Sequence, residues 1–201
     1  RPTGAASMQD GVDVMPVEEA LERVPGVRRR YFGKAFERCG KDFERDTAGG
    51  YFVRVRAGVK TELPLQACLW MTTRGFRQRI HNIVVVEEGA DALLINGCTS
   101  SRAARESHHL GVSEFFVHRN GRLNFTMIHS WGEDVDVEPR SAAVVEEGGV
   151  FLSNYVCLRP VRKIVMYPTC LCAGAGARAR FSSIILGHPG SLQDIGGRVI
   201  L

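Results

Sequence analysis

The feature that most constrains the fold of this chain is a repeated phrase, in which a glycine-containing turn is followed by a strand of alternating polar and apolar residues. The phrase occurs four times, and the residues that follow its turns are Asp91, Arg122, Val150 and Arg178. They are separated by 31, 28 and 28 positions (122−91, 150−122, 178−150). A nearly constant period indicates one structural unit stacked on copies of itself, because a single unit cannot bury its apolar face alone.

This period predicts a mainly β chain that forms a parallel β-helix over residues 49–201, with two or three short strands in each coil. Residues 123–127 alternate apolar and polar side chains, and residues 177–183 alternate arginines with small or aromatic residues, as strands with one buried face do. No long helical pattern separates these strands, which argues against βαβ units. An antiparallel sandwich is the alternative, although it does not predict similar turns at a fixed spacing.

Residues 1–48 are predicted to form a separate N-terminal lead and helical segment. Residues 1–14 have the composition of a flexible lead. Residues 15–24 are predicted to be a short helix, because their apolar side chains share one face and Pro16 suits a first helical turn. Residues 31–46 are predicted to be a second helix.

Composition and charge argue against several classes of protein. Apolar residues make up 44% and charged residues 24% of the chain, which is ordinary for a soluble globular protein, and no apolar run approaches the length of about 18 residues that spans a membrane. Basic residues are scattered except at residues 28–30, a triplet of arginines that we expect to be an exposed turn rather than a nucleic-acid contact. Six cysteines without a signal peptide indicate reduced thiols in the cytoplasm.

Several segments, in matching order, resemble the SufB/SufD family of iron–sulfur cluster assembly scaffold proteins, and in particular its shorter, archaeal-type members. The resemblance extends from about Met15 to Leu201 and rests on the segments GYFVRVRAGVKTELPLQACL, HNIVVVEEGADALLINGCTS, HLGVSEFFV, NFTMIHSWGEDVDVEPR, GGVFLSNYVCL and ARARFSSIIL. It implies a right-handed parallel β-helix core. The family's last coils and C-terminal helices have no counterpart in this chain, which therefore resembles a fragment of such a protein.

The resemblance also implies the partners of the full-length protein. These are a SufC-type ABC ATPase and a second SufB/SufD-type subunit, in a homo- or heterodimer that carries a transient iron–sulfur cluster. The chain contains no GxxxxGK[S/T] phosphate-binding loop, so ATP chemistry is expected in the partner and no enzymatic turnover is expected of this chain. No nucleic-acid partner and no membrane partner is expected.

Cys98 is the first candidate site residue. It lies in residues 96–99, at the end of an alternating strand. This segment resembles the E-G-C-T segment of SufB, whose cysteine receives sulfur and passes it inward. Sulfur transfer needs a thiolate with partial access and a lowered pKa. The alternative is a buried, inert core cysteine, and Asn96 stands where SufB tends to have glutamate.

Three further residues are candidates for a sulfur relay. His109 matches a histidine that follows this cysteine in SufB, and on one strand it is expected to face opposite to His108. His129 and Trp131 lie two positions apart and share a strand face. Their segment resembles SufB's T-x-I-Q-N-W, with histidine in place of glutamine, beside a proposed sulfur path. The alternatives are a hydrogen-bonded structural histidine and an ordinary aromatic core.

Cys170 and Cys172 are a weaker candidate, for a metal site. They lie two positions apart on a predicted strand, so both sulfurs project to the same side and could supply half of a soft-metal site. No second pair of closely spaced cysteines completes such a site, and cysteines that only pack in the core are the alternative.

Two other functions remain open from the sequence. A structural SufD-like subunit would share the fold without sulfur chemistry. A carbohydrate-active β-helix enzyme would use paired acids such as Asp134 and Asp136, for which a solvated strand face is the alternative.

Overall fold

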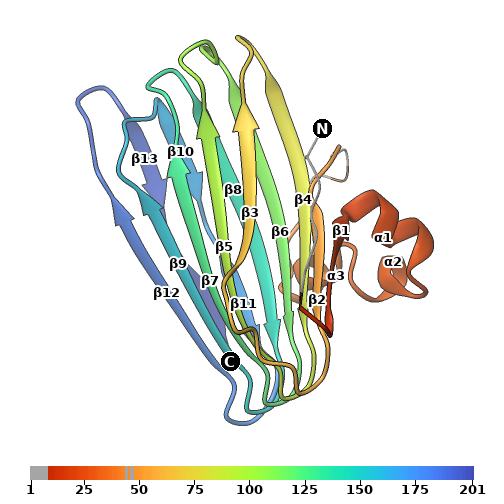
Figure 1. Ribbon diagram of the computed structural model, residues 1–201. Coiled ribbons are helices and arrows are strands. Elements are labelled where there is room, and N and C mark those ends of the chain that lie inside the picture. The colour runs from red at the N-terminus through yellow and green to blue at the C-terminus, as the bar shows by residue number, and fades with distance from the viewer. Residues whose placement is uncertain (1–8, 44, 46–47) are drawn as a thin grey trace.

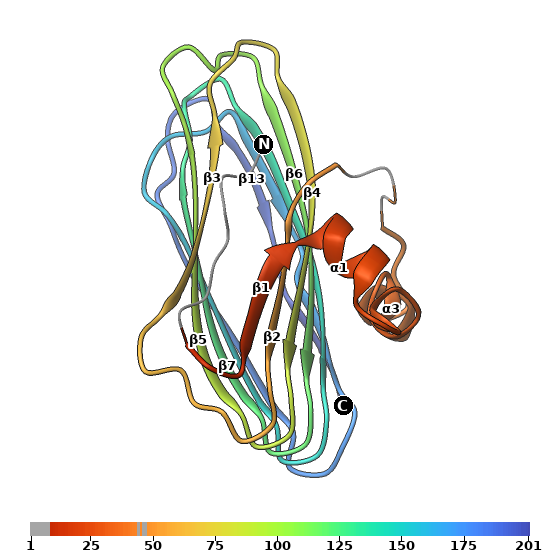
Figure 2. The same ribbon diagram turned by 45° about the vertical axis from the view of Figure 1, so that its right-hand side comes forward.

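The computed structural model describes residues 9–43, 45 and 48–201. The backbone winds into a parallel β-solenoid of about five turns, which confirms the predicted β-helix (Figure 1). Two sheets face each other, and the chain alternates between them as it winds (Figure 2). Within the described residues, the larger sheet has nine strands and the smaller sheet has five.

The middle turns contribute one long strand to each sheet, and the later turns contribute two short strands instead of one long strand to the nine-stranded sheet. Each coil therefore holds two or three strands, as predicted, although many of them are longer than expected. All strand pairings are parallel except that of β1 with β2. The nine-stranded sheet contains β1 (Val12–Pro16), β2 (Tyr51–Val55), β4 (Arg77–Val86), β6 (His108–Val117), β8 (Asp136–Val145), β10 (Lys163–Met166), β11 (Thr169–Cys172), β13 (Leu192–Ile195) and β14 (Arg198–Ile200). The five-stranded sheet contains β3 (Leu65–Met71), β5 (Asp91–Ser100), β7 (Arg122–Ser130), β9 (Val150–Cys157) and β12 (Arg178–Ile185).

The repeat period is the length of one turn of the solenoid. Asp91, Arg122, Val150 and Arg178 are Cα partners in neighbouring strands of the five-stranded sheet. The turn residue two positions before each of them has a positive φ, which favours glycine or asparagine and explains why glycine recurs there. These turn residues are Gly89 (φ 65°), Asn120 (55°), Gly148 (63°) and Gly176 (71°).

Three short helices cover the outer face of the nine-stranded sheet near β2, β4 and β6 (Figure 2). The protein therefore has two apolar cores. One lies between the two sheets, and the other lies between the helices and the sheet, where Phe36 and Cys39 pack with Phe52, Leu110 and other residues. The second core explains why β4 and β6 are buried on both faces. The helices are α1 (Val17–Arg23), α2 (Val27–Arg30) and α3 (Lys34–Arg38).

The N-terminal part differs from its prediction in two places. Residues 12–14 form part of β1 rather than a flexible lead, because they pair with the edge strand β2; residues 1–8 lie outside the described residues. The predicted helix over residues 31–46 is confirmed only in part, because α3 spans the five residues Lys34–Arg38 and the left-handed Gly33 (φ 77°) precedes it. The first predicted helix is confirmed as α1, and the division after residue 48 stays a prediction.

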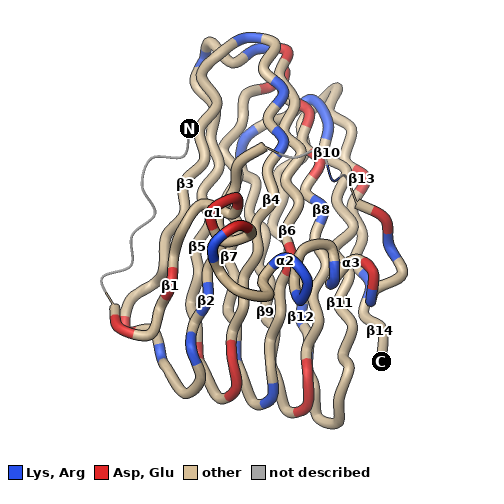
Figure 3. The backbone as a smooth tube through the Cα atoms, turned by 90° about the vertical axis from the view of Figure 1, so that its right-hand side faces the viewer, with Lys and Arg blue, Asp and Glu red and all other residues tan. Residues whose placement is uncertain are grey.

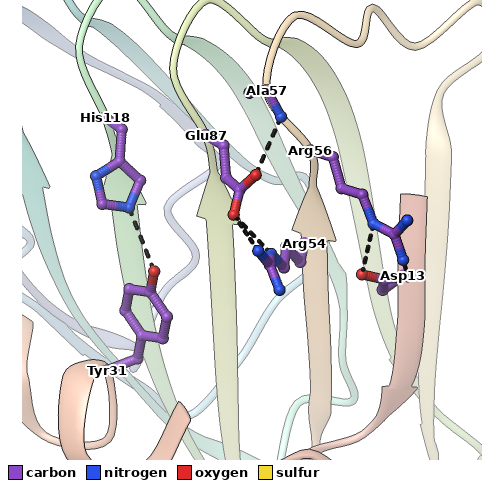
Figure 4. A network of polar contacts seen from close by, with 7 residues as sticks. All are labelled: Asp13, Tyr31, Arg54, Arg56, Ala57, Glu87 and His118. Carbon is purple, nitrogen blue, oxygen red and sulfur yellow. Dashed lines mark hydrogen bonds and ion pairs between the residues drawn. The ribbon is translucent and has the colours of Figure 1, made fainter. Parts of the chain in front are cut away.

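Polar contacts join the N-terminal part to the solenoid (Figure 4). Arg56 follows β2, and its guanidinium lies 2.8 Å from the Asp13 carboxylate of β1. The Tyr31 hydroxyl, at the end of α2, lies 3.4 Å from His118 Nε2 after β6. These contacts hold the first strand and the helices against the same sheet.

Charged residues lie mostly at the turns of the solenoid and on the helices (Figure 3). The arginines at positions 28–30 are exposed, as predicted, but they lie on the helical turn α2 rather than in an open turn. In the ranges that the structure describes, no helix combines the length and the apolar character needed to cross a membrane.

Gly50 lies where a side chain cannot fit. Its φ is 117°, and a Cβ atom there would lie 2.0 Å from the carbonyl oxygen of His81. Because a backbone atom cannot move aside cheaply, we expect Gly50→Ala to lower the free energy of unfolding by about 2–4 kcal/mol. Gly58→Ala is the control, since Gly58 also has a positive φ (71°) but open space around it, and it should cost about 1 kcal/mol. Equal midpoints for the two variants in urea denaturation would contradict this account.

Candidate functional site

The stacking of turns brings Cys98 and His129 side by side. They lie in β5 and β7, and they are Cα partners in the five-stranded sheet. Their separation of 31 positions (129−98) is one turn of the solenoid. Both side chains point into the space between the sheets, where each is 2% exposed. Sulfur transfer from solvent would need a partly exposed Cys98. The fold instead buries this side chain.

The nine-stranded sheet places His109 opposite this pair. His109 lies on β6 with its side chain buried, while its neighbour His108 points outward and lies 3.4 Å from Glu138. The prediction that the two histidines face opposite sides is confirmed. One potential ligand atom from each of Cys98, His109 and His129 lies within 4.8 Å of the other two. Residues from both sheets thus meet at one point in the interior.

Trp131 closes one side of this group. Its ring centroid lies 4.7 Å from that of His109 and 5.2 Å from that of His129. The side chain is buried, and its Nε1 has no hydrogen-bond partner within the described part of the chain. The four residues predicted for a sulfur relay, Cys98, His109, His129 and Trp131, are therefore brought together by the fold, while their role stays a prediction.

Hydrogen bonds orient both histidine rings. The Gln78 side-chain oxygen accepts a hydrogen bond from His109 Nδ1 at 2.8 Å, which leaves Nε2 of that ring with its lone pair. His129 Nδ1 lies 2.8 Å from the Tyr155 hydroxyl, and this hydrogen bond fixes the orientation of the ring. Nε2 of His129 is buried and has no hydrogen-bond partner among the described residues. In the tautomer in which Nδ1 donates to the hydroxyl oxygen, Nε2 carries a free lone pair.

Burial decides the protonation of the group at neutral pH. Removal from water raises the pKa of the Cys98 thiol well above its usual value, although the Asn96 amide 3.5 Å away opposes the shift. Burial and then the neighbouring His108 lower the pKa of His109 to about 3. Burial and then His109 lower the pKa of His129 well below its usual value. The interior thus holds a protonated thiol and two neutral imidazoles.

Three residues of this site were not predicted as site residues. Gln78 and Tyr155 hold the two histidine rings, and burial followed by the nearby Cys98 raises the pKa of Tyr51. The repeat contained a signal for Gln78, because it precedes His109 by 31 positions (109−78) and is its Cα partner.

A small cavity of about 30 Å³ lies beside Tyr155 in the interior. Its lining includes Gly111, Met127 and Met166, so it leads from the neighbourhood of the histidines towards the later turns. A cavity of this size can hold about one water molecule or a single heavy atom.

Cys170 and Cys172 lie elsewhere, on β11 of the nine-stranded sheet. Both pack towards the inter-sheet core, as their spacing predicted, and burial followed by the neighbouring Cys172 raises the pKa of the Cys170 thiol. Across the described residues, the group around Cys98 is the only set of three or more close potential metal ligands, so this pair lacks further ligands. All six cysteines of the chain are free.

The acidic residues considered for a carbohydrate enzyme lie outside the solenoid. Both carboxylate oxygens of Asp136 bind the Arg162 guanidinium at 2.7 Å. Because the Asp136 carboxylate is held by Arg162, it is not free to act as a catalytic acid or base. This pairing argues against the use of Asp136 in a carbohydrate-active enzyme.

Comparison with known proteins gives one consistent family. Residues 69–201 match the family model described as "SUF system FeS cluster assembly, SufBD core domain". An iron–sulfur cluster assembly SufBD family protein of Archaeoglobus fulgidus is 42% identical over 200 residues, which cover 98% of this chain and 53% of the relative. A protein of the same description from Methanothermobacter thermautotrophicus is 34% identical, with 96% of this chain and 48% of the relative covered. The chain thus spans about half the length of the curated relatives that it matches.

Proposed function

Because this chain belongs to the SufBD family of iron–sulfur cluster assembly proteins, we propose that it supplies the β-solenoid core of an assembly scaffold. In this proposal the full-length protein works with a SufC-type ATPase and a second SufB/SufD-type subunit, and an iron–sulfur cluster is its transient cargo. The lack of a phosphate-binding loop in the sequence supports placing ATP hydrolysis in the partner. The chain itself would act without enzymatic turnover, in the cytoplasm.

We further propose that Cys98 receives sulfur during assembly. The observation that carries this is the position of Cys98 beside His129 in the interior, where the rings of His109 and Trp131 pack against the same histidine. A small cavity begins at Tyr155, the hydrogen-bond partner of His129, and would continue the path towards the later turns. The position of Cys98 in a segment that resembles the sulfur-accepting segment of SufB supports the same role.

The transfer has a simple chemical balance. A persulfide donor, R–S–SH, loses its terminal sulfur to Cys98 as the donor S–S bond breaks and a new S–S bond forms at Cys98 Sγ. The donor leaves as a thiol. The Cys98 proton must be removed first, because the thiolate is the nucleophile. The raised pKa of Cys98 and the lowered pKa of His129 both oppose transfer of this proton to the imidazole, so the proton passes to the donor sulfur, which leaves as a thiol.

Cluster assembly on the full-length protein tests this role. With a persulfide donor, ferrous iron and reductant, Cys98→Ser is expected to reduce the cluster yield to the level without protein, because serine cannot form a persulfide. Cys170→Ser is the matched control, since Cys170 is also buried but lies outside the group, and it should assemble normally. A normal yield in Cys98→Ser, measured by iron and sulfide content, would remove Cys98 from the pathway and leave the family assignment intact.

The second candidate is a structural SufD-like role without sulfur chemistry. It is favoured by the burial of Cys98 and by the raised pKa of its thiol, since reactive thiols usually have lowered pKa values and some exposure. A normal cluster yield in Cys98→Ser, together with unchanged assembly of the complex, is the result expected for this role.

A further inference from the structure

We propose that Cys98, His109 and His129 form a binding site for a single divalent first-row metal ion inside the solenoid. One thiolate sulfur and two imidazole nitrogens are a donor set that suits Zn(II), Co(II) and Fe(II). The three ligand atoms come from two facing sheets and lie within 4.8 Å of one another. The arrangement is part of the folded interior rather than of a mobile surface, because every one of these side chains is at most 2% exposed.

The Nε2 atom of His129 independently points to a ligand. It is buried and has no hydrogen-bond partner among the residues that the structure describes. An unsatisfied buried polar atom is unfavourable, and a bond to a metal ion would satisfy it. The other ring nitrogen is already held by Tyr155, just as Gln78 holds the ring of His109. Metal-binding histidines characteristically have their second nitrogen fixed in this way.

Gly111 leaves the space beside His109 Nε2 free of a side chain. It follows His109 on the same strand face, and a Cβ atom there would lie 2.9 Å from His109 Nε2. Ligand atoms about 2.0–2.3 Å from a tetrahedral ion are closer together than 4.8 Å, and side-chain rotations on the order of 1 Å close the difference. Three protein ligands leave the fourth position open.

Charge balance indicates what occupies the fourth position. When the ion binds, the Cys98 thiol releases its proton to solvent and the sulfur bonds the metal as a thiolate. A divalent ion with one thiolate leaves one positive charge in an apolar interior, which is unfavourable without a further anion. Hydroxide or hydrosulfide would neutralise it. If the proposed function holds, on which this last step alone rests, the ion is ferrous iron and the anion is hydrosulfide, so iron and sulfide-level sulfur meet at Cys98.

An anaerobic Co(II) titration of the metal-free, reduced full-length protein tests the site. A thiolate-to-cobalt charge-transfer absorption and intense d–d bands are expected, which report a cysteine ligand and tetrahedral geometry. Cys98→Ser should lose the charge-transfer band of this site. His109→Gln and His129→Gln should weaken Co(II) binding by at least about 100-fold, and Tyr155→Phe by about 10- to 100-fold, because it removes only the support of a ligand.

Subtracting the Co(II) spectrum of each variant from that of the parent protein separates the signal of this site from that of any other cysteines of the full-length protein. Cys170→Ser is the matched control and should titrate like the parent, because Cys170 lies outside the group. Unchanged Co(II) spectra and affinity in both Cys98→Ser and His129→Gln would overturn the proposal. Should Cys98→Ser fail to fold, as judged by circular dichroism, the histidine variants decide the question alone.

The metal site and the proposed function fail separately. Normal Co(II) binding at Cys98 with normal cluster yield in Cys98→Ser would support the site and contradict the sulfur-accepting role. Loss of cluster yield in Cys98→Ser, with no Co(II) signal that depends on either histidine, would contradict the site and leave the role in place. Addition of sulfide to the Co(II) protein should shift the charge-transfer band if the fourth position takes hydrosulfide, and an unchanged spectrum would contradict that step.

Discussion

Replacing Glu114 by alanine is expected to lower the free energy of unfolding by about 3–5 kcal/mol, as is typical when one partner of a buried polar pair is removed. Glu114 lies on β6 with no exposed surface, and faces the helices. Its carboxylate accepts hydrogen bonds from the backbone N–H groups of Gly33 and Ala35, at 2.5 and 2.7 Å, and lies 2.8 Å from His81 Nε2. The substitution leaves three buried donors without an acceptor where α3 meets the sheet.

An exposed pair of the same chemistry provides the control. The carboxylate of Glu146 lies 3.1 Å from His118 Nδ1 on the surface, and its side chain is 40% exposed. Glu146→Ala should therefore change the free energy of unfolding by no more than about 1 kcal/mol. Glu114→Gln, which keeps one acceptor oxygen, should fall between the two. Urea denaturation measures all three, and equal losses at positions 114 and 146 would contradict a special role for the buried carboxylate.

Stability is also expected to fall steeply as the pH drops below about 6.5. In the unfolded chain His109 and His129 take up protons near pH 6.5, whereas in the folded protein burial keeps His109 neutral down to a pKa of about 3 and lowers the pKa of His129 well below its usual value. Between these limits the unfolded state binds more protons, so lowering the pH favours unfolding. Each histidine contributes a loss of about 1.4 kcal/mol per pH unit, or about 2 kcal/mol at pH 5.

Urea denaturation between pH 7.5 and 4.5 measures this slope. His129→Gln removes one titrating group and should flatten the dependence by about half, because glutamine can still donate a hydrogen bond to Tyr155. His109→Gln removes the other titrating group and should flatten the dependence by a similar amount. A parent whose stability does not change between pH 6.5 and 5 would show that the two histidines are not buried neutral.

Much of the fold could be predicted from the sequence because the repeat is visible in it. The four residues after the glycine turns are Cα partners in adjacent strands. The spacing of these residues therefore predicted the length of one solenoid turn, the register of the strands and the strand face that points inward. The N-terminal helices were predicted less well. They have no repeat and they are short. The left-handed Gly33, which precedes α3, donates its backbone N–H to Glu114, 81 positions away (114−33), so this turn depends on a contact that the local sequence does not show.

The candidate site was predictable in part. Cys98 and His129 were singled out separately, and the repeat alone would place them side by side, because they are one turn apart. Tyr155 carried no such signal, since an inward-facing tyrosine on a strand is ordinary core, and only its hydrogen bond to His129 distinguishes it. Whether Cys98 is accessible or buried could not be decided from the sequence, because a strand pattern does not reveal how completely two sheets cover a side chain.

The sequence by itself determined the period of the solenoid, the family and the residues that face inward, because these depend on local alternation and on matches along the chain. The tertiary structure decided which inward-facing residues meet across the interior. His109 and the pair Cys98–His129 belong to different sheets, and their approach to within 4.8 Å depends on how the turns align one sheet over the other. That alignment is a property of the packed interior as a whole, so no single segment of the chain encodes it.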